Sequence, residues 1–300
     1  MRHRLVLCIA LATVGFAAPA RAAVDVAATV PDLAAITKEI GGANVNVTSL
    51  SLSTQDPHFV DAKPNLVLKL HKADLLIAVG LDLEIGWLPT LQTQARNSKI
   101  QVGSAGYVEC SQFVKVLDIN GHADRTQGDV HPAGNPHYLY DPRRAAACAK
   151  GIAARLAKID PSHAKSYQKG LNGFVGRLDK ARKGWETRLA AYKNQPIISY
   201  HKSMSYLADW LGLREIGTLE PKPGIPPTAT HVVEIIKAAR TTGARVVLEE
   251  SYYPDKTGSL VASKIHGKVV VVPGGTDVQS GESYVAHMAK LVAKLEAAIR

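Results

Sequence analysis

Short apolar runs alternate with segments of helical periodicity along the first third of the chain. Residues 24–30 are apolar enough for a buried strand, and 31–40 follow as a helix with Pro31 in its first turn. By the same criteria, strands are predicted at 45–50, 75–79 and 100–102 and helices at 64–73 and 83–96. The strand runs are continuously apolar, which is typical of parallel strands buried on both faces.

The last third of the chain repeats this order of elements. Strands are predicted at 197–198, 246–248 and 269–272, and helices at 203–211, 230–240 and 284–299. Strands that alternate with helices favour a parallel sheet with helices on both faces. The two ends of the chain therefore predict an α/β protein with two βα lobes, each built on a mostly parallel sheet.

The middle of the chain carries helical signals only. An alanine-rich amphipathic helix is predicted at 142–159, and apolar or aromatic residues then keep helical spacing from 162 to 192. A helix of about 30 residues is about 45 Å long and would join the lobes as a rigid connector. We expect an N-terminal lobe at 23–160, a connector helix at 161–193 and a C-terminal lobe at 194–300.

The first residues resemble a secretory signal peptide. Arg2 and Arg4 precede an apolar run, 5–18, and Ala20-Arg21-Ala22 forms a small-x-small cleavage site. The run is shorter than the roughly 20 residues that a bilayer-spanning helix needs. We expect cleavage after residue 22, export to the periplasm and no spanning helix in the mature chain.

The charge of the chain bears on one further class of partner, nucleic acid. The chain carries a formal net charge of +10, and a basic surface is one feature of nucleic-acid-binding proteins. Here the lysines and arginines are scattered singly along the predicted helices, and export removes the protein from nucleic acid. We expect a solvated basic face and no nucleic-acid partner.

Two cysteines, Cys110 and Cys148, remain after cleavage of the signal segment. An exported compartment permits them to form a disulfide. The alternative is two separate buried thiols, and the sequence leaves this choice open.

Three histidines occupy comparable positions. Asp56-Pro57-His58 lies beyond a predicted strand, Asn135-Pro136-His137 precedes the 142–159 helix, and Ser199-Tyr200-His201 follows another strand. Asp277 follows the last strand. Ligands of parallel α/β sheets bind beyond the carboxyl ends of strands, so we expect these residues to meet in the cleft between the lobes. Neutral imidazoles suit Zn²⁺ and related ions, and a carboxylate lowers the charge of the filled site.

Taken in order, these three segments resemble the metal-specific solute-binding proteins of ABC importers, the zinc and manganese group. Ala73-Asp74-Leu75, Gly80 and the segment from Glu84 to Leu88 extend the resemblance over the mature chain. It implies a metal site made of His58, His137, His201 and Asp277. It also implies a monomer that captures Zn²⁺, with Mn²⁺ as the alternative cargo, and delivers it to an ABC transporter membrane permease.

Other residues compete for roles near this site. Glu250 follows a strand and is either an alternative ligand or a carboxylate that orients an imidazole. His122 and His131 lie in the polar segment 121–134 and are either auxiliary metal ligands or part of an ordinary loop.

A secreted zinc hydrolase is the rival function. Catalytic zinc keeps one position open for water, whereas four protein ligands close the shell. The chain has neither a His-Glu-x-x-His helix nor a Gly-x-Ser-x-Gly elbow. We therefore expect a binding protein and not an enzyme.

Overall fold

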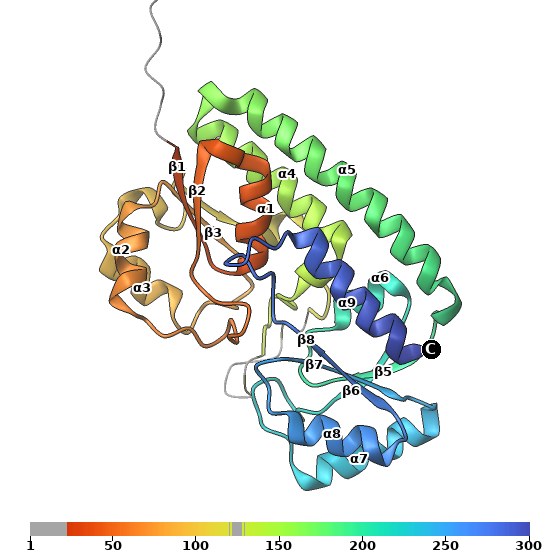
Figure 1. Cartoon of the computed structure of the whole chain (residues 1–300). Coiled ribbons are helices and arrows are strands. Elements are labelled where there is room, and N and C mark those ends of the chain that lie inside the picture. Colours follow the sequence, from red (N-terminus) through yellow and green to blue (C-terminus); the bar gives the residue numbers. More distant parts are fainter. Residues whose placement is uncertain (1–22, 120, 122–127, 129) are drawn as a thin grey trace, which may run out of the picture.

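The computed structural model of the chain describes residues 23–119, 121, 128 and 130–300, so the predicted signal segment 1–22 lies outside the described residues. Two four-stranded sheets form two lobes (Figure 1). The first has the order β2-β1-β3-β4, with bounds Val45–Ser49, Val24–Ala28, Leu75–Ala78 and Tyr107–Glu109. The second has the order β6-β5-β7-β8, with bounds Arg214–Thr218, Pro196–Ser199, Val246–Glu250 and Lys268–Val272. Every strand pair is parallel, which confirms the predicted fold class.

Helices cover these sheets on both faces. In chain order the helices are α1 Pro31–Gly41, α2 Pro64–Lys72, α3 Leu88–Ala95, α4 Pro142–Ile159, α5 Ala164–Leu189, α6 Ser205–Leu211, α7 Ala229–Thr242, α8 Asp255–Lys264 and α9 Tyr284–Ile299. In the first lobe, α2 and α3 lie on the side of the sheet away from α1 and α4 (Figure 1). Within the described part of the chain, no helix is both long and apolar enough to cross a bilayer.

Alternate side chains of β3 pack into two hydrophobic cores, one on each face of the first sheet. Leu75 and Ile77 of β3 belong to a large core that also contains residues of α1, α4 and α5. Leu76 and Ala78 belong to a separate core with residues of α2 and α3. All four side chains are buried, so the continuous apolar run in the sequence reflects burial on two faces.

The connector predicted from helical spacing is α5, which has 26 residues. It extends along one side of the molecule past both lobes (Figure 1). Gly170 lies where α5 crosses the end of α1, and a Cβ there would be 2.1 Å from the carbonyl oxygen of Ile40. This glycine therefore permits close helix packing, which explains a residue that by itself disfavours a helix.

The helix predicted at 83–96 begins later, at Leu88. A turn precedes it, in which Leu81 and Asp82 have φ values of 55° and 62°. The buried carboxylate of Glu84 accepts hydrogen bonds from the backbone N–H groups of Val79 (2.7 Å) and Gly80 (3.1 Å). These bonds hold the end of β3 as a turn and replace the first helical turns that periodicity predicted.

Other elements also differ from the sequence prediction. The fourth strand is Tyr107–Glu109, and the apolar residues near 100 form a short 3-10 helix at Ser98–Ile100 instead. The edge strand β6, Arg214–Thr218, and the polar helix α8, Asp255–Lys264, were not predicted. Both are partly exposed elements with mixed polar sequences, so hydrophobic patterning does not reveal them.

Asp160, at the corner between α4 and α5, provides the first testable prediction. Its buried carboxylate accepts hydrogen bonds from Tyr167 (2.6 Å), His163 (2.7 Å) and Ser162. Burial alone would raise the pKa of Asp160, but these bonds lower it to about 2. This stabilisation is complete above the unfolded pKa near 3.8 and is lost as the pH falls toward 2.

We therefore expect Asp160→Asn to lower the free energy of unfolding by about 2 kcal/mol at pH 7, as one pKa unit corresponds to ~1.4 kcal/mol. Urea unfolding of both proteins between pH 7 and pH 3 measures the difference. It should shrink as the pH falls, and a difference independent of pH would contradict the ionic origin of the effect.

Candidate metal centre

Three histidines predicted from the sequence lie together in the structure. His58 is in the loop after β2, His137 precedes a short 3-10 helix and α4, and His201 directly follows β5. The ring centroid of His58 lies 5.2 Å from that of His137 and 5.1 Å from that of His201. The centroids of His137 and His201 are 5.1 Å apart. The three imidazoles surround one point and come from both halves of the chain.

Carboxylates orient two of these rings. Nδ1 of His58 lies 2.7 Å from Asp56 Oδ1, and Nδ1 of His201 lies 2.7 Å from Glu220 Oε2. A carboxylate accepts, so each Nδ1 carries the proton and each Nε2 keeps its lone pair for a metal ion. Burial alone would raise the pKa of Asp56, but the hydrogen bond with His58 lowers it.

The same pairing affects the protonation of His201. Burial alone would lower the pKa of His201, but the hydrogen bond with Glu220 and its negative charge raise it. A bound cation would therefore compete with a proton for Nε2 of His201. The Glu220 carboxylate would remain behind the ring and increase its strength as a ligand.

His137 has no such partner on its inner nitrogen. Among the described residues, its Nε2 is buried and has no hydrogen-bond partner. Burial and the neighbouring rings of His201 and His58 hold the pKa of His137 well below its usual range. A neutral imidazole with an unsatisfied, buried nitrogen fits a metal ligand, since an orphaned polar atom otherwise destabilises the fold.

A fourth histidine, His131, joins the cluster. Its Nδ1 donates to the carbonyl oxygen of Leu81 (2.8 Å), and its Nε2 lies 3.2 Å from Nε2 of His58. When both rings are neutral, two lone pairs face each other, and this arrangement favours a cation between them. Ligand atoms of His58, His131 and His137 all lie within 4.8 Å of one another. His122, the other histidine predicted in this loop, lies outside the described residues.

Glu250 is the last residue of β7, and its charge interacts with that of His201. Its Oε1 accepts a hydrogen bond from Tyr140 (3.4 Å), and its buried Oε2 has no hydrogen-bond partner in the described chain. Burial raises the pKa of Glu250, whereas a hydrogen bond with the Ser203 side chain and the charge of His201 oppose this shift. Its neighbour Glu249 points to the other face of the sheet, against Gly258 of α8.

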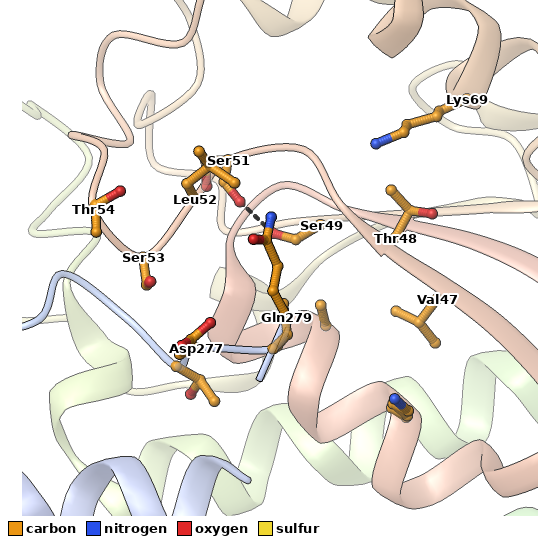
Figure 2. A pocket seen from close by; sticks show the side chains of 14 residues that line it. Val47, Thr48, Ser49, Ser51, Leu52, Ser53, Thr54, Lys69, Asp277 and Gln279 are labelled. Atoms are coloured by element: carbon orange, nitrogen blue, oxygen red, sulfur yellow. Dashed lines mark hydrogen bonds between the residues drawn. The ribbon is translucent and has the colours of Figure 1, made fainter. Parts of the chain in front are cut away.

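The structure places Asp277 in the turn between β8 and α9. Its side chain is exposed and lines a cavity of about 460 Å³ that includes Ser53 and Gln279 (Figure 2). Asp277 Oδ1 accepts from the backbone N–H of Ser280 (3.3 Å), and its own N–H donates to Glu282 (2.8 Å). These local bonds hold the turn. Asp277 is not among the residues whose ligand atoms gather with those of His58, and its role as the fourth ligand stays a prediction.

Cys110 and Cys148 are both buried and are free thiols in the structure. Sγ of Cys148 lies 3.8 Å from the carbonyl oxygen of Cys110, so the two residues are neighbours in the core of the first lobe. Of the two alternatives that the sequence left open, the structure has two buried free thiols, and they lie close together.

Sequence reasoning missed the two carboxylates that orient the rings. Asp56 is two residues before His58, and this spacing allows it to bind both the backbone N–H and the ring of that residue. Glu220 follows β6, a strand that hydrophobic patterning did not predict. Its place beyond a strand end becomes visible only once β6 is recognised as a strand.

The fold and the histidine cluster define a two-lobed protein of the metal-binding class. Comparison with known proteins agrees with this class. Residues 26–298 match the family described as zinc-uptake complex component A, periplasmic. The chain belongs to this family.

Curated relatives align over most of this chain. A manganese ABC transporter substrate-binding lipoprotein, scaA of Streptococcus gordonii, is 27% identical and aligns over 95% of this chain and 94% of its own. The high-affinity zinc uptake system protein ZnuA of Bacillus subtilis is 23% identical over 79% of this chain and 73% of its own. These relatives are named as substrate-binding or uptake proteins, which confirms that the chain is not an enzyme and removes the hydrolase alternative.

Solved structures show the same architecture. A crystal structure of ZnuA superimposes with a TM-score of 0.79, at 22% sequence identity, and covers 93% of this chain and all of its own length. At this identity the match supports the two-lobed fold alone.

Proposed function

We propose that this protein captures Zn²⁺ in the periplasm and delivers it to the membrane permease of an ABC importer. The observation that carries the proposal is the buried Nε2 of His137, which has no hydrogen-bond partner among the described residues and lies between two carboxylate-oriented imidazoles. His58, His137 and His201 each supply one nitrogen ligand. The protein acts as a monomer, and export through the 1–22 segment places it with its permease.

A fourth ligand completes the shell. His131 is the nearest candidate, since its Nε2 already lies 3.2 Å from that of His58. Asp277 is the fourth ligand expected from the sequence, and its Oδ1 accepts from the backbone N–H of Ser280. The charge of Glu250 acts on His201 and would add negative charge to the filled site.

The ligand set favours zinc over manganese. Three imidazoles and one further donor complete a tetrahedron, which Zn²⁺ accepts without an electronic penalty. Mn²⁺ prefers oxygen-rich sites and has the lowest affinity of the common divalent transition metals for a given nitrogen site. The relatives carry both zinc and manganese in their names, so the donor atoms of this chain are the better guide.

Competition between the two ions tests the proposal. Metal-free protein is dialysed against equal free concentrations of Zn²⁺ and Mn²⁺, and bound metal is measured by elemental analysis. We expect a single ion per chain, at least ten parts zinc to one part manganese, as a preference of ~1.4 kcal/mol already gives this ratio. Equal or greater manganese occupancy would refute the zinc assignment.

The same dialysis identifies the fourth ligand. His131→Ala and Asp277→Ala are compared with the wild-type protein, each at limiting free Zn²⁺. The true fourth ligand is the one whose loss weakens zinc binding and lets manganese compete better. If neither substitution changes the occupancy, water or Glu250 completes the shell.

A further inference from the structure

One side chain bridges two of the proposed ligands without being a ligand itself. The Oδ1 atom of Asn135 accepts a hydrogen bond from the backbone N–H of His137 (2.9 Å). Its Nδ2 donates to the carbonyl oxygen of Lys202 (2.7 Å), the residue directly after His201. One buried amide thus holds the backbone beside a ligand before α4 and the backbone beside a ligand after β5.

The backbone of Asn135 is fixed as well. Its N–H donates to the carbonyl oxygen of Leu117 (2.9 Å), and its carbonyl oxygen accepts from the hydroxyl of Tyr206 (2.6 Å). The same hydroxyl accepts from the N–H of Leu117 (2.9 Å), and the remaining amide proton of Asn135 is directed to Asp118 (3.1 Å). Every polar group of Asn135 is therefore paired, so the amide has a single stable orientation.

We propose that Asn135 is a positioning residue that sets the separation of His137 and His201 across the two halves of the chain before metal arrives. This inference rests on the proposed function. The two rings do not bond each other, and Nε2 of His137 has no partner in the described chain that could hold it in place. Their 5.1 Å separation therefore depends on the backbone that carries them. A preformed spacing removes the ordering that binding would otherwise require.

A second asparagine provides a matched control. Asn97 is also buried, accepts from the backbone N–H two residues on (3.1 Å), and donates to the carbonyl oxygens of Leu70 (2.8 Å) and Ala73 (2.7 Å). It makes the same kinds of bonds as Asn135 but joins α2 to the loop after α3, away from the histidines. Asn97→Ala therefore reports the general effect of losing a buried amide.

The experiment measures Zn²⁺ affinity by competition with a chelator and records the visible spectrum of the Co²⁺-loaded protein. Four-coordinate Co²⁺ absorbs more strongly than ions of higher coordination number, so the spectrum reports the geometry of the ligands. We expect Asn135→Ala to weaken zinc binding at least tenfold and to reduce the Co²⁺ band intensity. Asn97→Ala should leave both unchanged, even if it lowers the melting temperature of the metal-free protein by a similar amount.

Two further variants sharpen the result. Asn135→Asp keeps the acceptor for the His137 N–H but loses the donor to Lys202, so it should bind zinc as weakly as Asn135→Ala. If Asn135→Ala does not fold, Tyr206→Phe removes the bond to the Asn135 carbonyl and should weaken zinc binding a few-fold with the same spectral change.

The outcomes separate this inference from the proposed function. A wild-type protein that binds neither Zn²⁺ nor Co²⁺ would overturn the proposed function itself. Wild-type binding that Asn135→Ala leaves unchanged would overturn only the role of Asn135. Equal weakening by Asn97→Ala would also overturn it, because the effect would then be one of general stability.

Discussion

Replacing His137 by alanine is expected to remove most of the stabilisation that bound zinc confers, while the metal-free fold stays intact. A ligand at a thousandfold excess over its dissociation constant stabilises the folded state by ~4 kcal/mol. For a chain of this size, that corresponds to a rise in melting temperature of roughly 10 °C. His137→Ala should lose nearly all of this rise, as measured by thermal unfolding with and without zinc.

The metal-free protein should tolerate this change because of the environment of the ring. Nε2 of His137 is buried with no hydrogen-bond partner in the described structure, so its removal relieves an unsatisfied polar atom. The pKa of His137 is held low by burial, so protonation adds no ion pair that the variant would lose. The metal-free melting temperature should change by only a few degrees, in contrast to the metal-bound one.

His71→Ala is the matched control for this experiment. His71 lies on α2, and its ring bonds the carbonyl oxygen of Ala95 (2.9 Å), outside the cluster. The control should keep the full zinc-induced shift. A His137→Ala protein that also keeps it would show that His137 is not a ligand, and the remaining histidines would then have to account for binding.

The histidine trio could be predicted from the sequence because each ring depends on local features. His58 and His201 follow strands, and His137 is fixed between two prolines just ahead of α4. Parallel sheets bring the carboxyl ends of their strands to one edge, so strand assignment alone places such residues close together. The long connector α5 was predictable for a similar reason, since its apolar residues keep one periodicity over 26 residues.

Contacts between distant residues were not accessible in this way. Thr276, next to Asp277, donates through its backbone N–H to Asp32 of α1 (2.8 Å), and this contact helps to hold the turn that carries Asp277. No local pattern encodes a bond over so large a sequence distance. The position of Glu220 behind His201 is likewise a tertiary feature, because it depends on the pairing of β6 with β5.

The amide of Asn135 shows how a local motif acquires a long-range role. Asparagine commonly bonds the N–H two residues on in turns, and Asn135 does so with His137. The structure adds the bond from its Nδ2 to the carbonyl oxygen of Lys202, which the sequence does not reveal. The hydrogen bond to His137 is thus a local feature, whereas the bond to Lys202 depends on how the two halves of the chain pack.

When the protein folds in an oxidising compartment, we expect Cys110 and Cys148 to form a disulfide. The two thiols are fully buried neighbours, and their side chains hydrogen-bond each other. That bond and burial raise the pKa of Cys110 well above its usual range, which disfavours the thiolate that attacks during exchange. Oxidation should therefore occur during folding, before burial, and the folded dithiol should oxidise slowly.

The disulfide would close the segment that carries His131 and His137, and on the chain-entropy model it would stabilise the fold by about 3–4 kcal/mol. Protein exported to the periplasm and unfolded without reductant should show no free thiol on titration. Urea unfolding with and without reductant then measures the stability difference, and Cys110→Ala/Cys148→Ala serves as the control that reductant leaves unchanged. Two titratable thiols in the exported protein would show that the pair stays reduced, as the structure has it, and the loop that carries both histidines would then be held by packing and hydrogen bonds alone.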